Sequence, residues 1–91
     1  MATLEGRGSF LLDSGNRLGD CEYRLVETSE GVAWRGTITF LSLEWTPRLG
    51  GGFLLELDNG KRLRCELWKL KDPKYIGRPH SYEARCWLET K

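Results

Sequence analysis

Apolar side chains recur at every second position through most of this chain, which is the spacing of a strand with one buried face. No stretch keeps the period of an amphipathic helix for more than one turn, and eleven glycines interrupt every candidate helix. The pattern therefore predicts six short strands. Their inward positions are Leu4, Gly6, Gly8, Phe10 and Leu12, then Cys21, Tyr23 and Leu25, then Val32, Trp34, Gly36, Ile38 and Phe40, then Phe53, Leu55 and Leu57, then Leu63, Cys65 and Leu67, and finally Tyr82, Ala84, Cys86 and Leu88.

The alternation is interrupted at several places. Leu18 is out of phase with Cys21, so we expect an irregularity such as a β-bulge near Gly19 and Asp20. The phase changes again over residues 41–45, which predicts a strand that bends from one layer to the next. Residues 46–52 and 71–80 contain the prolines and clustered glycines of irregular connections.

One hairpin register can be derived from burial. A two-residue loop at Asn59-Gly60 would set leucines opposite arginines. A three-residue loop, Asp58-Asn59-Gly60, joins strands 53–57 and 61–68 and brings their apolar faces together. Because a slip of one residue exchanges the two faces of a strand, burial favours the three-residue loop, with Gly60 in the left-handed conformation.

Six short strands without a helix to cover them must bury one side of their sheet against itself. We therefore expect an all-β fold, a single antiparallel six-stranded barrel or barrel-like sandwich over residues 1–91. Closure into a barrel also removes exposed strand edges. The small inward residues Gly6, Gly8 and Gly36 suit tight curvature, because layers approach closely at glycine.

Composition agrees with one small globular domain. The chain has 91 residues, of which 40% are hydrophobic and 30% charged, and its net charge is +1. Its apolar runs are far shorter than the roughly 20 residues of a membrane helix, and its first residues lack the pattern of a secretory signal. We therefore expect a cytoplasmic protein without a membrane partner.

The three cysteines and the single histidine do not form a recognisable site. Cys21, Cys65 and Cys86 are far apart in the sequence, whereas structural zinc sites take ligands in close pairs. An odd number of cysteines indicates free thiols in a reducing compartment. His80 lies in a loop segment without a nucleophile motif, so no metal, cofactor or catalytic residue is predicted and an enzyme is a distant third hypothesis.

Basic and aromatic residues gather in the last third of the chain. Residues 59–91 carry nine basic and four acidic residues, whereas residues 1–58 carry five and nine. If the last two strands are neighbours, their outward positions share one surface. The candidate interaction residues are Arg62, Arg64, Trp68, Arg85 and Trp87.

This candidate surface has three interpretations. It suits a protein interface, either with a second copy or with another protein, because tryptophan and arginine are enriched at interfaces. It also suits nucleic acid or another anionic ligand, through phosphate attraction and base stacking. The same residues could only stabilise the sheet through cross-strand and cation–π contacts. Because the net charge is close to zero, we favour a non-catalytic binding or assembly module that acts through a protein interface.

Overall fold

The computed structural model describes residues 3–29, 31–41, 50–70 and 81–88. Its six strands are β1 (Thr3–Leu12), β2 (Arg17–Ser29), β3 (Ala33–Phe40), β4 (Gly50–Glu56), β5 (Arg62–Leu70) and β6 (Ser81–Leu88). They form a closed barrel in the order β1-β2-β3-β6-β5-β4, and all neighbours are antiparallel. This result confirms the predicted all-β class and six-stranded barrel. The described residues include no helix long and apolar enough to cross a membrane.

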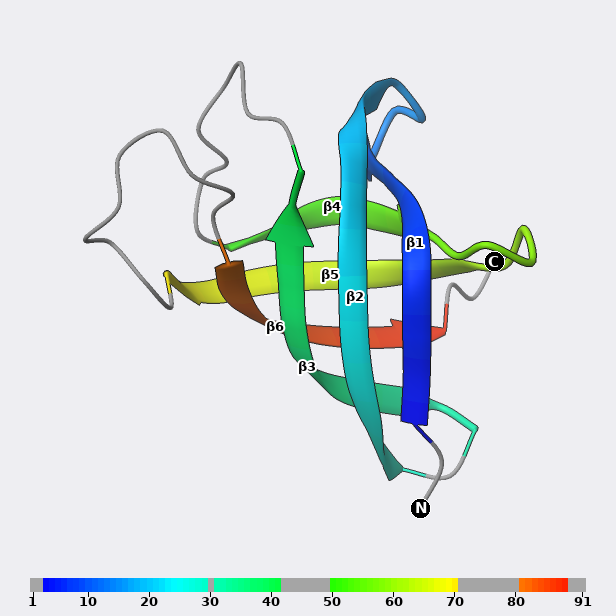
Figure 1. Ribbon diagram of the computed structural model, residues 1–91, viewed down its shortest axis with the longest axis vertical. Coiled ribbons are helices and arrows are strands. Elements are labelled where there is room, and N and C mark those ends of the chain that lie inside the picture. Colours follow the sequence, from blue (N-terminus) through cyan, green and yellow to red (C-terminus); the bar gives the residue numbers. More distant parts are fainter. Residues whose placement is uncertain (1–2, 30, 42–49, 71–80, 89–91) are drawn as a thin grey trace.

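The barrel consists of two crossed layers, visible in Figure 1, where β1, β2 and β3 pass steeply across β4, β5 and β6. The strand β1 closes the barrel because it pairs with two neighbours. It pairs with β2 along almost its whole length, but with β4 only through Ser9–Leu12. The seam between β1 and β4 is therefore the shortest pairing in the barrel.

Most side chains that the alternation predicted to face inward do lie in the barrel interior. Phe10, Leu25, Ile38, Leu55, Leu67 and Cys86 are among those with no or almost no exposed surface. Two residues that the alternation predicted to face the core are exposed instead. Leu12 is 38% exposed because β1 ends there and the chain turns outward, and Val32 is 55% exposed because it lies in the turn before β3.

Irregularities in strand pairing occur near glycines and near points where the apolar alternation changes phase. The expected irregularity in β2 is present, one residue earlier than predicted: Phe10 lies opposite Gly19 and Leu11 opposite Arg17, so Leu18 has no opposite residue. The prediction that residues 50–52 belong to a loop is wrong, because β4 begins at Gly50. Gly50 and Gly52 have φ values of +125° and +92°, which glycine tolerates, and the register shifts before Phe53.

The hairpin of β4 and β5 has the register selected by burial. Phe53 lies opposite Cys65 and Leu55 opposite Leu63. At its end the Leu57 N–H donates to the Lys61 carbonyl at 2.7 Å, and Gly60 has a φ of +88°. The predicted bend over residues 42–45, the connection at 46–49 and the loop at 71–80 with His80 lie outside the described residues.

Candidate interaction surface

The strand order places the outward side chains of β3, β6 and β5 next to one another, because β6 lies between the other two strands. Arg35 of β3 lies directly opposite Arg85 of β6, and Ala33 lies opposite Trp87. On its other side, Arg85 lies opposite Glu66 of β5. These strands therefore bring an arginine from the middle of the sequence to the predicted surface.

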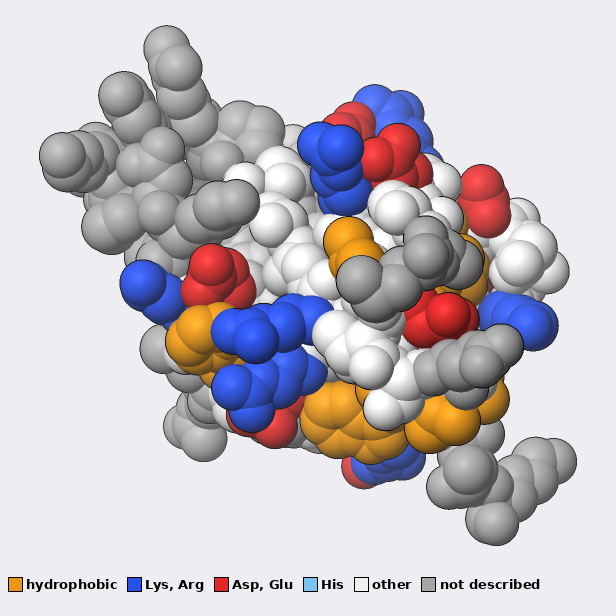
Figure 2. Space-filling view, turned by 90° about the horizontal axis from the view of Figure 1, so that it is seen from below, with side chains coloured by type: hydrophobic (Ala, Val, Ile, Leu, Met, Phe, Trp, Pro, Cys, Tyr) orange, Lys and Arg blue, Asp and Glu red, His pale blue; other side chains and the backbone are white. Residues whose placement is uncertain are grey.

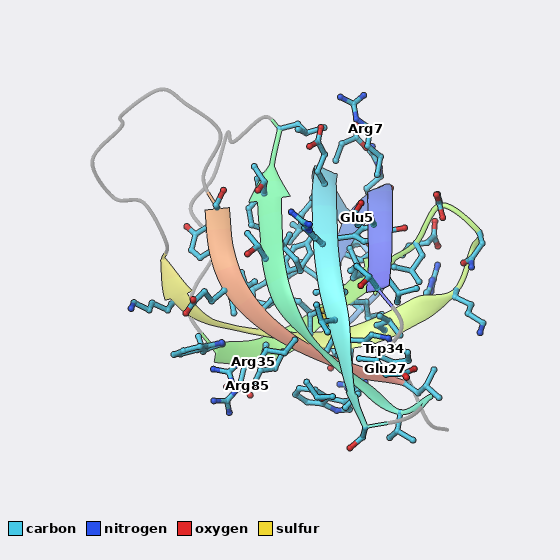
Figure 3. The ribbon with its side chains drawn as sticks, turned by 60° about the horizontal axis from the view of Figure 1, so that its bottom comes forward. Glu5, Arg7, Glu27, Trp34, Arg35 and Arg85 are labelled. Atoms are coloured by element: carbon cyan, nitrogen blue, oxygen red, sulfur yellow. The ribbon has the colours of Figure 1, made fainter. Side chains whose placement is uncertain are left out.

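Trp68 occupies a bulge in β5. Leu67 lies opposite Ala84 and Lys69 opposite Glu83, so Trp68 is the additional residue between them. Such a bulge redirects a side chain without ending the strand pairing. The guanidinium carbons of Arg35 and Arg85 lie 5.4 Å and 5.2 Å from the centre of the Trp68 ring, within cation–π range. Figure 3 shows Arg35 and Arg85 side by side on their adjacent strands.

These two arginines differ from the others in the described part of the chain. Of its seven arginines, five form ion pairs with carboxylates: Arg7 with Glu22, Arg17 with Asp20, Arg24 with Glu5, Arg62 with Glu56, and Arg64 with Asp13. Arg35 and Arg85 have no ion pair among the described residues, although Glu66 lies opposite Arg85 in the register. Like charges directly opposite each other destabilise a sheet. The contacts with Trp68 offset this repulsion by about 0.5–1 kcal/mol each.

The structure separates the predicted surface residues into two groups. Trp68, Arg85 and Trp87 lie together, as the alternation predicted, with Arg35 added to them. Arg62 and Arg64 face outward on β5, and Arg64 lies directly opposite Trp87, but both guanidinium groups form ion pairs with carboxylates. The Arg62 Nε lies 3.0 Å from a Glu56 oxygen, and an Arg64 Nη reaches across β4 to Asp13 at 2.8 Å.

Exposed apolar side chains lie beside Arg35 and Arg85. Val26 of β2 lies directly opposite Arg35 and is 40% exposed, and Trp87 is 38% exposed. We call the surface formed by Val26, Arg35, Trp68, Arg85 and Trp87 the arginine–tryptophan face. Figure 2 shows Lys and Arg side chains gathered beside hydrophobic ones on this side of the barrel.

Elsewhere, charged groups on the barrel exterior largely neutralise one another. A shallow depression over β1, β2 and β3 is bordered by the ion pairs of Glu5 with Arg24 and of Arg7 with Glu22. Figure 3 shows Glu5 and Arg7 well apart from Arg35 and Arg85. This depression therefore offers little unpaired charge to a ligand.

The three cysteine side chains lie in the barrel interior. All three cysteines are unbonded and buried. Burial, with a smaller contribution from Asp20, raises the pKa of Cys21 to about 12, and burial with the Cys86 contact raises the pKa of Cys65 well above its usual value. The Cys21 and Cys65 thiols are therefore protonated at neutral pH, which makes them poor nucleophiles. Among the described residues no group of histidine, cysteine or acidic side chains could hold a metal ion.

No family model matches this chain, and searches of curated proteins and of solved structures found no significant similarity.

Proposed function

We propose that this protein is a small non-catalytic binding or assembly module that acts through a protein contact at the arginine–tryptophan face. The observation that carries the proposal is the pair Arg35 and Arg85. The two guanidinium groups lie opposite each other without a carboxylate partner in the described part of the barrel. The expected partner is a protein that presents an acidic segment.

The physical argument begins with the cost of this pair. Two cations on directly opposed positions repel each other, and a carboxylate held between them would remove that repulsion. Arginine binds carboxylates through two parallel hydrogen bonds, which gives such a contact orientation as well as affinity. Trp87 and Val26 beside the pair supply the apolar surface that a protein interface buries.

A second copy of this chain is the other protein partner to consider. A symmetric dimer places the same patch of both copies together. Contact through this face would then bring Arg35 and Arg85 of both copies close to one another, which adds repulsion. The acidic partner therefore fits the charges of the face better than self-association does.

Nucleic acid, or another anionic ligand, is the alternative function. Arg35 and Arg85 would attract phosphates, and Trp87 is exposed enough to stack against a base. Two features make this function less favourable. The Trp68 ring is already contacted by two arginines, and the charges of Arg62 and Arg64 are balanced by carboxylates.

The remaining parts of the proposal concern chemistry and location. A non-catalytic role fits the burial of all three thiols and the ion pair that holds Glu56. No cofactor and no membrane is part of the proposed role. Three unbonded cysteines fit a reducing compartment, so we propose the cytoplasm.

The test is a titration of tryptophan fluorescence at low ionic strength. An oligo-glutamate peptide should change the emission, and added salt should weaken binding because the contact is ionic. The double variant R35Q/R85Q should lose at least tenfold in affinity. The matched control R7Q/R24Q removes the same charge from β1 and β2 and should bind as the parent chain does.

Other outcomes would contradict the proposal. No response to oligo-glutamate, or an equal loss in both double variants, would remove the arginine–tryptophan face as an acidic-partner site. Tighter binding of a single-stranded oligonucleotide with the same dependence on Arg35 and Arg85 would favour the alternative. A dimer in sedimentation velocity that Trp87→Glu converts to a monomer would favour self-association.

A further inference from the structure

Two of the three buried thiols lie directly opposite each other. Cys65 of β5 and Cys86 of β6 are partners in the register of these strands. Their sulfur atoms are 2.7 Å apart, and both side chains are shielded from solvent. The structure therefore places two thiols in contact across a strand pair, inside the barrel.

The backbone shows which kind of cross-strand pair they form. The Leu88 N–H donates to the Val32 carbonyl, on the side of β6 that faces β3. Because N–H groups alternate in direction along a strand, the Cys86 N–H also points toward β3. Cys65 and Cys86 are therefore a non-hydrogen-bonded pair, in which the Cα atoms are only about 4.5 Å apart. That separation lies within the range of disulfide-bonded cysteines, about 4.4–6.8 Å.

From this geometry we infer that Cys65 and Cys86 are a site of reversible disulfide formation, closed by exchange with a low-molecular-weight disulfide such as glutathione disulfide. The first thiolate attacks that disulfide, forms a mixed disulfide and releases one glutathione thiolate. The second thiolate then attacks the mixed disulfide, which forms the Cys65–Cys86 bond and releases a second glutathione. Both cysteine protons pass through solvent to the released thiolates, so two thiols are oxidised while one disulfide is reduced.

Burial determines when the exchange occurs. Because the thiolate is the reacting form, exchange in the closed barrel is slow. It proceeds while the chain folds or while β5 and β6 separate, and the same burial afterwards protects the bond from external thiols. The bond would lie beneath the arginine–tryptophan face, since Cys86 stands between Arg85 and Trp87 in β6. This inference does not depend on the proposed binding function.

The third cysteine provides an internal control. Cys21 is also fully buried and lies near enough to Cys86 within the core for the two thiols to interact, but it belongs to β2, which pairs with β1 and β3, so it has no cross-strand register with β5 or β6. Its register partners are Gly8 and Phe40. Cys21 is therefore expected to remain a free thiol when the other two are oxidised.

The experiment is a count of free thiols after refolding. The reduced, unfolded full-length chain is refolded in a glutathione redox buffer, then denatured in N-ethylmaleimide and analysed by intact mass and peptide mapping. We expect one label, on Cys21, and a peptide linkage between Cys65 and Cys86. C21A should form the same bond, whereas C65A and C86A should not, and the oxidised chain should unfold at higher urea concentration than the reduced one.

Two results would overturn the inference. One is three labelled cysteines after refolding under oxidising conditions. The other is a linkage that includes Cys21 at comparable abundance. The linkage map of the unmodified chain decides the question even if a core variant fails to fold.

Discussion

The substitution Gly8→Ala tests how the barrel is closed. Gly8 lies in β1 immediately before the short seam with β4, and its missing side chain leaves room for the β4 backbone. A Cβ atom at this position would lie 2.2 Å from the Glu56 carbonyl oxygen and 3.2 Å from its carbonyl carbon. Backbone atoms of a paired strand cannot rotate away, so β1 and β4 would have to separate.

The cost can be estimated from this displacement. Ordinary contact would require the strands to move apart by about 1 Å, and overpacking of this kind costs about 1–3 kcal/mol. Loss of a neighbouring hydrogen bond in the seam adds about 1 kcal/mol. The lower freedom of alanine in the unfolded chain returns about 0.4–1 kcal/mol. We therefore expect Gly8→Ala to reduce the free energy of unfolding by about 2 kcal/mol.

Urea unfolding followed by tryptophan fluorescence measures this loss. With a slope of about 1 kcal/mol/M for a domain of this size, the midpoint should fall by about 2 M. Gly6→Ala is the matched control, because its Cβ would meet the side-chain ends of Tyr23 and Asp58, at 2.9 Å and 3.0 Å, which can move. Its effect should stay within about 1 kcal/mol. Equal stability of Gly8→Ala and the parent chain, or a larger loss in Gly6→Ala, would refute the close approach of β1 to β4.

Two further predictions concern buried hydroxyl and thiol groups. The Tyr23 hydroxyl donates to Asp58 Oδ1 at 3.2 Å, so Tyr23→Phe should cost about 1 kcal/mol in urea unfolding. Tyr82→Phe should cost less, because that hydroxyl has no hydrogen bond to a described residue, and an equal loss would contradict the role of Asp58. Burial raises the pKa of Cys21 from 9.0 to about 12, so its unfolded form releases a proton first and stability present below pH 9 should be lost as the pH rises toward 12. Cys21→Ala should reduce that slope in urea midpoints measured under reducing conditions, and an unchanged slope would contradict this assignment.

Much of the barrel interior could be predicted from the sequence because side chains alternate with a period of two. The hairpin of β4 and β5 shows why the prediction extends to register. Any slip by one residue would expose Leu55 and bury Arg64, so only one pairing places Phe53 beside Cys65. Burial thus determines which residues of adjacent strands meet.

Strand ends could not be predicted in the same way. Leu12 and Val32 continue the apolar alternation, yet both lie where the chain leaves the barrel and turns. The prediction failed in the opposite direction at Gly50. The glycines there were predicted to form a loop, but they begin β4, with left-handed backbone conformations at Gly50 and Gly52. Alternation specifies a face, but it does not specify the point at which neighbouring strands stop covering that face.

The candidate surface depended on strand order, which local patterns do not encode. The outward phase of Arg35 was visible in the sequence, but only the insertion of β6 between β3 and β5 brings it opposite Arg85. The carboxylates opposite Arg7 and Arg24 form ion pairs with them, whereas Glu66, which lies opposite Arg85, forms none, and Arg35 has no ion pair among the described residues either. Cation–π contact with Trp68 holds the two guanidinium groups together without neutralising their charge, and this positive charge is the physical reason that we propose an acidic partner for this face.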